Sequence, residues 1–263
     1  MGKLTRFVTP DTATVSLKVG CAVHILPLEE TAETVNLAQN KVHIDVIGEG
    51  VVVRRSGSDI SVEQTGLSSR AGVTIIGDVC GNSIITGNYN TVIRSGRDTV
   101  VSYDGSRVTV NGKVIQGDDT PPPSVTIFTN HPINLKLDLR NEASLVSSGL
   151  VTLLDVAGSA VSSELSIHSM NGSFDMSLSN NARGFAQMNG SVEVSISNSG
   201  YFAFYGEFVS VHASASNGAR VSTHGMCFGD YKASATNAST ISHYGEVQGR
   251  VRKSSSNESI VEV

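Results

Sequence analysis

The second half of the chain repeats a short segment about every 20 residues, and this repeat constrains the fold more than any other feature. The segments align at turn positions that are 17, 22, 18, 19, 20 and 20 residues apart. These positions are Asn141, Gly158, Asn180, Asn198, Asn217, Asn237 and Asn257. A unit of this size cannot bury its apolar side chains alone, so successive units are expected to stack around one continuous core.

An alternating apolar stretch precedes each turn, as in VEVSI before Asn198 and YKASA before Asn237. Side chains along a β-strand point to opposite faces in turn, so one set faces the core and the other faces solvent. Asn tolerates the left-handed backbone conformation of a sharp corner, and stacked amides can hydrogen-bond along the stack. The pattern predicts an all-β chain with a parallel β-solenoid and a turn ladder of Asn141, Asn180, Asn198, Asn217, Asn237 and Asn257.

A second set of similar residues recurs at a fixed distance after three of these turns. Tyr205, His224 and Tyr244 come seven residues after Asn198, Asn217 and Asn237, and each precedes a Gly. Three residues further on, Phe208, Cys227 and Val247 form a predicted apolar column. Because aromatic side chains are enriched in recognition surfaces, the outward column Tyr205, His224 and Tyr244 is the candidate binding strip.

Composition limits the function classes. Trp is absent and aromatic residues make up 5% of the chain, so the core must consist of many small side chains in repeated layers. The net charge is −5 with no basic stripe, which argues against nucleic-acid binding. Cys21, Cys80 and Cys227 lack metal-ligand spacing and are expected to be buried free thiols, so neither a metal nor a cofactor is predicted.

Thr120 and the three prolines that follow it interrupt the β pattern and predict a linker at 120–123. It would separate a smaller β-rich domain at 1–119, serving for attachment, from the solenoid at 124–263. The first region could be a smaller solenoid or a β-sandwich, and the solenoid is favoured. A short helix is a candidate at Leu28–Gln39, and Asp104-Gly105 and Asn111-Gly112 suit tight turns.

The segments VEVSISNSGYFAFYG, VSVHASASNGARVSTHG and YKASATNASTISHYG carry a family resemblance. They resemble the head GIN domain family of auto-transporter adhesin-like proteins over about residues 124–263. The resemblance implies a right-handed parallel β-solenoid and names no catalytic residues. This sequence departs from the family by using Asn where the family often has Gly, and by lacking the signal peptide of its secreted members.

The sequence carries only weak signals of a catalytic or metal site. No nucleophile elbow, P-loop or dinucleotide-binding glycine motif occurs. Asp138, Asp155, Asp175 and Glu193 recur near the ends of alternating stretches, where a polysaccharide-cleaving pair could lie. A metal site could be indicated by the histidines His168, His212, His224 and His243. His224 and His243, however, are offset by one position in the aligned repeat, so their side chains should point to opposite sides of the strand. A solvated face and a non-enzyme are therefore predicted.

These features favour a structural or adhesive protein, specifically a bacteriophage virion component such as a fibre, collar or head-decoration protein. The alternatives are a cytoplasmic protein-binding module and a polysaccharide-binding or polysaccharide-cleaving β-helix. The expected partners are proteins, including further copies in a homo-oligomer or larger assembly, or a cell-surface glycan, with no membrane. Because neither an apolar leader nor an apolar run of about 18 residues occurs, a virion or cytoplasmic location is expected.

Overall fold

All regular secondary structure in the described residues is β-strand. The computed structural model describes residues 4–10, 13–28, 41–47, 50–64, 74–75, 92–93, 101–104, 107–110, 113–116, 123–129 and 131–263. Within these ranges no helix is long and apolar enough to cross a membrane. The candidate helix at Leu28–Gln39 lies, apart from Leu28, outside the described residues, and so does Cys80.

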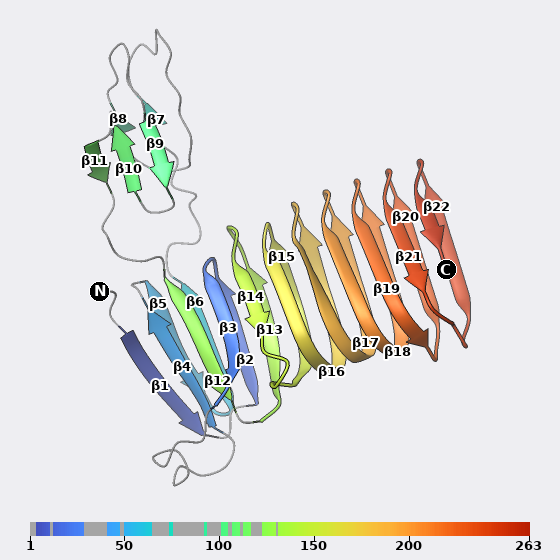
Figure 1. Cartoon of the computed structure of the whole chain (residues 1–263), viewed down its shortest axis with the longest axis horizontal. Helices are drawn as coiled ribbons and strands as arrows, with labels where there is room; N and C mark the ends of the chain where they lie inside the picture. Colours follow the sequence, from blue (N-terminus) through green and yellow to red (C-terminus); the bar gives the residue numbers. More distant parts are fainter. Residues whose placement is uncertain are drawn as a thin grey trace.

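Most strands belong to a single sheet that winds into two stacked layers, named here face A and face B (Figure 1). From one end of the stack to the other, face A contains β1 (Leu4–Pro10), β4 (Lys41–Ile47), β12 (Ser124–Thr129), β3 (Ala22–Pro27), β14 (Ser144–Ser147), the first parts of β16 (Glu164–Ser179), β17 (Arg183–Ser197) and β18 (Tyr201–Ser216), then β19 (Arg220–Cys227), β21 (Thr240–Tyr244) and β23 (Ile260–Glu262). Face B contains β5 (Val51–Ser56), β6 (Asp59–Gln64), β2 (Thr14–Val19), β13 (Ile133–Leu139), β15 (Leu153–Val161), the second parts of β16, β17 and β18, then β20 (Tyr231–Thr236) and β22 (Val251–Ser256).

Every pairing in the C-terminal part of the stack is parallel, which confirms the predicted β-solenoid. At the N-terminal end the order changes, because β4 pairs antiparallel with β1 and β12, and β5 pairs antiparallel with β6. Antiparallel pairing allows the short connection between β5 and β6, whereas each parallel neighbour in the coils requires a full turn of the chain.

Two small sheets lie outside the stack (Figure 1). One is the parallel pair of β7 (Thr74–Ile75) and β8 (Val92–Ile93). The other consists of β9 (Val101–Asp104), β10 (Arg107–Val110) and β11 (Lys113–Gln116), paired antiparallel. Its strands flank the two predicted tight turns, whose glycines lie outside the described residues.

The stack continues across the boundary predicted at 120–123, and here the structure differs from the sequence-based expectation. β3 pairs in parallel with both β12 and β14, and β2 pairs in parallel with β13. Strands from 1–119 therefore share a sheet with strands from 124–263. The physical reason is that proline interrupts a strand without dictating where the chain goes next, and β12 begins at Ser124, directly after Pro123.

One predicted turn is also misplaced. Gly158 lies inside β15, where it pairs with Leu137 on one side and Met176 on the other. The turn of this coil is at Ser162, which has a φ of 50° and lies 21 residues after Asn141 and 18 before Asn180. The alignment of the repeats was wrong at this coil because it assumed that a glycine forms the turn, whereas Ser162 adopts the left-handed conformation there.

The core lies between the two faces and is built from columns of equivalent residues. One column of face B contains Leu139, Ala160, Leu178, Ile196, Ala215 and Ala235, all nearly inaccessible to solvent. The predicted apolar column is present as well, with Phe208 paired to Cys227 and Cys227 bridged to Val247. Burial raises the pKa of the Cys227 thiol, and it raises that of Cys21 to about 11, so both thiols stay protonated at neutral pH.

A glycine column follows the aromatic strip at the corner between face A and face B. Gly206, Gly225 and Gly245 lie one above another, and Gly225 has a φ of 135°. A Cβ atom on Gly225 would overlap the carbonyl oxygen of Gly206 in the coil below. Only glycine therefore allows adjacent coils to approach this closely here.

We expect Gly225→Ala to lower the free energy of unfolding by more than about 2 kcal/mol, because it combines backbone strain with overlap against a neighbouring backbone. Urea denaturation followed by circular dichroism measures this. Gly149→Ala is the matched control, since its new Cβ would meet only the His168 Cβ at 3.8 Å. Equal stability of the two variants would contradict the close-approach argument.

Candidate functional site

The structure brings five of the six turn asparagines into one ladder along an edge of the stack. After Asn180, each side-chain amide donates to the amide oxygen of the asparagine in the preceding coil, at 3.0 Å for Asn198 to Asn180, 3.1 Å for Asn217 to Asn198, 2.9 Å for Asn237 to Asn217 and 2.8 Å for Asn257 to Asn237. All five have a φ between 53° and 56°. Asn141 has the same conformation, but its next coil turns at Ser162, so it lies outside the amide chain.

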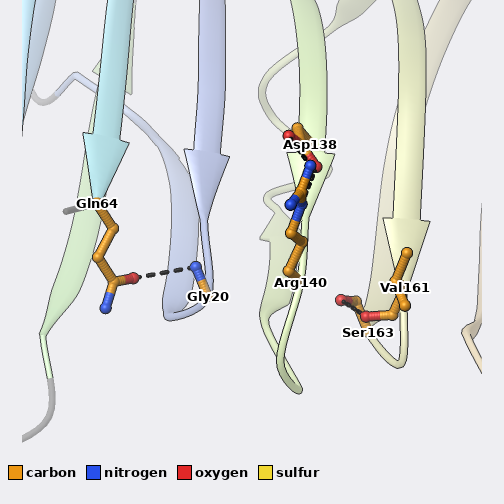
Figure 2. Close-up of polar contacts among 6 residues, drawn as sticks. All are labelled: Gly20, Gln64, Asp138, Arg140, Val161 and Ser163. Carbon is orange, nitrogen blue, oxygen red and sulfur yellow. Dashed lines mark hydrogen bonds and ion pairs between the residues drawn. The ribbon is translucent and has the colours of Figure 1, made fainter. Parts of the chain in front are cut away.

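The earlier coils close the corresponding corners with other side chains (Figure 2). Gln64 Oε1 accepts a hydrogen bond of 3.0 Å from the backbone N–H of Gly20. In the next coil Arg140 Nε donates to Asp138 Oδ1 at 2.7 Å. In the coil after that, Ser163 Oγ donates to the carbonyl of Val161 at 2.8 Å. The ladder is therefore a device for holding corners, and its hydrogen-bonding groups are largely satisfied within the chain.

The candidate binding strip is a ring stack. The ring centroids of Tyr205 and His224 are 4.7 Å apart with an interplanar angle of 14°, and His224 and Tyr244 are 4.7 Å apart at 15°. Each ring covers a face of its neighbour, so the strip presents ring edges and polar tips to solvent. Tyr205 and Tyr244 remain 41% and 58% exposed, which leaves these edges accessible to a partner.

An open groove of about 480 Å³ lies beside this strip on face A and shares Tyr205 with it. We call it the face A groove, lined by Glu164, Arg183, Gly184, Phe185, Gln187, Tyr201, Ala203 and Tyr205. Tyr201 and Tyr205 are four residues apart on β18, with the buried Ala203 between them as part of the floor. Strand geometry separates the two tyrosine backbones by about 13 Å, so the groove is wide and shallow.

Contacts within the chain hold several groove side chains in place. Arg183 Nη2 lies 4.0 Å from Glu164 Oε2 across neighbouring coils. The Tyr201 hydroxyl lies 3.5 Å from Ser222 Oγ. Phe185 packs edge-on against His168 at 5.0 Å, and His168 Nδ1 lies 2.7 Å from the Ser147 carbonyl oxygen. The groove therefore combines positioned aromatic rings with an exposed ion pair.

The four candidate carboxylates are not gathered into one site. Asp138 is paired with Arg140, and Asp155 Oδ1 accepts hydrogen bonds from Ser173 Oγ at 2.6 Å and Ser173 N at 2.9 Å. The Ser173 hydrogen bonds lower the pKa of Asp155, which disfavours its use as a general acid. Asp175 and Glu193 are neighbours on the open surface of face B.

The four candidate histidines are likewise dispersed. His168 packs on Phe185, His224 belongs to the ring stack, and His212 is on face B. His243 points inward as expected, with its Nδ1 2.8 Å from Thr223 Oγ1, which is 2.9 Å from the Tyr231 hydroxyl. Among the described residues no group of three or more His, Cys, Asp or Glu could hold a metal ion.

Sequence reasoning missed the groove residues Phe185, Gln187 and Tyr201. The signal that could have found them is the outward set of each face A strand, compared between coils. Arg183, Phe185 and Gln187 occupy the same three positions as Tyr201, Ala203 and Tyr205 in the next coil. Searching for identical residues in a column finds the turn ladder but overlooks a surface made of unlike residues.

The turn ladder gives a test that separates backbone conformation from amide hydrogen bonding. Asn217→Ala should lower the free energy of unfolding by about 1–3 kcal/mol, because Ala disfavours the left-handed conformation and loses two amide contacts. Asn217→Gly loses the same contacts but tolerates the conformation, so we expect about half that effect. Urea denaturation of both variants checks this, and a larger effect of Gly than of Ala would contradict it.

Burial lowers the pKa of His243, and the neighbouring His224 contributes in the same direction. The unfolded chain, with an ordinary pKa of about 6.5, then binds a proton more readily than the folded chain does. The contribution of His243 to stability is therefore complete above about pH 6.5 and is lost as the pH falls below it. Wild type should lose more unfolding free energy between about pH 7.5 and pH 5.5 than His243→Gln, and identical pH profiles would contradict this.

No family model matches the sequence, and no curated protein matches it, so the resemblance to the head GIN domain family stays a prediction. Similar solved structures include a "putative adhesin" from Bacteroides fragilis NCTC 9343, at 8% identity and a TM-score of 0.49, covering 99% of this chain and 96% of that one. Another is a "putative adhesin" from Parabacteroides merdae ATCC 43184, at 11% identity and a TM-score of 0.47, covering 100% and 97%. A third, from Parabacteroides distasonis ATCC 8503 and given the same description, has 11% identity and a TM-score of 0.43, covering 100% and 98%. At these values the likenesses carry no argument about function.

Proposed function

We propose that this protein is a non-catalytic structural and adhesive element that binds an extended glycan in the face A groove. The observation that supports this most directly is the groove itself, in which aromatic rings and hydrogen-bonding side chains converge on an open surface of about 480 Å³. Binding sites typically combine a mainly apolar lining with a few placed polar groups.

The chemistry of the lining favours a sugar over a purely apolar ligand. A sugar ring has an apolar C–H face and a rim of hydroxyls, so it suits an aromatic surface edged by donors and acceptors. Phe185, Tyr201 and Tyr205 supply the aromatic part. Arg183 donates, Glu164 accepts, and the Gln187 amide does both.

The shape of the stack favours a long ligand. Residues at one position repeat from coil to coil at the strand spacing of about 4.8 Å, so the walls of the groove run along the stack. The Tyr201 wall continues into Arg220 and Thr240, and the Tyr205 wall continues into His224 and Tyr244. A ligand chain lying along these walls would contact several coils at once, and weak contacts would add.

We place this adhesive element in a bacteriophage virion, as a fibre, collar or head-decoration protein, which is the narrower form of the proposal. A continuously hydrogen-bonded stack is a stiff body that suits a projecting part of a particle. Mass spectrometry of purified virions from the host strain tests this directly. Recovery of the protein only from the soluble cell fraction would favour a cytoplasmic binding module instead.

The groove test is a glycan array followed by titration of the best soluble polysaccharide. Tyr201→Ala/Tyr205→Ala should weaken binding at least about tenfold, because it removes the apolar surface of both walls. Phe228→Ala is the matched control, since Phe228 is an aromatic residue that is 48% exposed outside the groove. The affinity of the Phe228→Ala variant for the polysaccharide should stay within about twofold of wild type.

Three results would contradict the proposal. If wild type binds no glycan, or if the tyrosine variant binds as well as wild type, the groove is not a glycan site. If the bound polysaccharide shortens during incubation, the protein is an enzyme. In that case Asp155→Asn and Asp175→Asn would identify the carboxylate responsible.

A further inference from the structure

The outer surface of face B carries an ordered column of charges that the proposed function does not use. Asp175, Glu193, His212, Lys232 and Arg252 occupy the same strand position on five successive coils. We call this set the charge column. Two acidic residues lie at one end, two basic residues lie at the other, and a histidine lies in the middle.

The charged side chains of this column are not paired within the described part of the chain. None of the five side chains forms an ion pair or a side-chain hydrogen bond with another described residue. Yet Asp175 and Glu193 are direct neighbours on adjacent strands, as are Lys232 and Arg252. Like charges directly opposite each other destabilise a sheet. An external partner with the opposite charge at each end would relieve this repulsion.

The surroundings of the column leave room for such a partner. A shallow hollow of about 430 Å³ runs along it. Two residues further along the same strands lies a column of exposed serines: Ser177, Ser195, Ser214, Ser234 and Ser254. Such small side chains allow another sheet to approach, and their hydroxyls can keep hydrogen bonds to trapped water.

We propose that the partner is a second copy of this chain, packed face B to face B in an antiparallel dimer. The two-fold axis lies in the interface, parallel to the strands, and passes through His212. This rotation reverses the order of the column, so that Asp175 faces Arg252 of the other copy and Glu193 faces its Lys232. A two-fold interface must be self-complementary, and a column that changes sign about its midpoint meets that condition.

The same pattern selects against the alternative orientation. If the two stacks ran parallel, each residue of the column would face its own copy, and all four charged positions would repel. The charge order therefore specifies orientation as well as association.

The area of the proposed interface sets the expected affinity of the dimer. Five strands at about 4.8 Å spacing, each about 20 Å long, give on the order of 500 Å² per copy. This amounts to about 1,000 Å² in total, at the lower end of specific protein interfaces. Because exposed ion pairs are screened by salt, the dimer should be weak and salt-sensitive.

Sedimentation velocity over a range of concentrations tests the proposal on the intact chain. At low salt the mass of wild type should rise from 27.6 kDa toward twice that value, and it should return to the monomer value at about 0.5 M salt. Lys232→Glu/Arg252→Glu makes all four charged positions acidic, and Asp175→Lys/Glu193→Lys makes them all basic. Each variant alone should raise the dissociation constant at least about tenfold, whereas an equimolar mixture should regain the dimer.

Lys136→Glu is the matched control. Lys136 occupies the same strand position on β13, two coils before Asp175, beyond the five-strand overlap, so this variant should dimerise like wild type. The proposal is overturned if wild type stays monomeric at about 100 μM in low salt. It is equally overturned if either double variant dimerises as well as wild type, or if the mixture fails to associate while both variants keep the wild-type circular dichroism spectrum.

Discussion

The parallel hydrogen-bonded register between successive coils is the constraint on which the rest of the structure depends. It places residue 193 beside 175 and residue 212 beside 193, and it continues in this way through the last coil. Every position in one coil therefore lies directly over an equivalent position in the next coil. Inside, this repetition makes a dry core from small side chains, and outside it turns single residues into ladders, stacks and grooves.

The core shows how the stack tolerates variation within this constraint. In the inner column of face B, the side chains become smaller from Leu178 and Ile196 to Ala215. At the level of Ala215, face A compensates with Phe202 and Phe204, which form an aromatic cluster with Phe174 at centroid distances of 4.9 to 5.2 Å. The bulky rings of face A and the small side chain of face B thus lie in the same coil, as a close-packed interior requires.

Sequence reasoning was effective where one residue type repeats at one position. It predicted the left-handed asparagine corners and the opposite orientations of His224 and His243, because both follow from counting residues between turns. It failed at Ser162, where the corner uses another residue, and at β2 and β3, whose neighbours in the sheet are distant in the sequence. The face A groove and the charge column combine unlike residues, so no repeated letter marks either one.

The position of β3 has a consequence for how the chain must be made. Its two neighbours on face A are β12 and β14, which follow it by about 100 residues or more in the sequence. During synthesis β3 therefore leaves the ribosome long before either neighbour exists, and it remains a strand with two open edges until both arrive. The C-terminal coils pair with neighbours about 20 residues away and can add one by one. Closure around β3 is thus the slow, long-range step, and a nascent chain stalled before β14 is the form most exposed to aggregation.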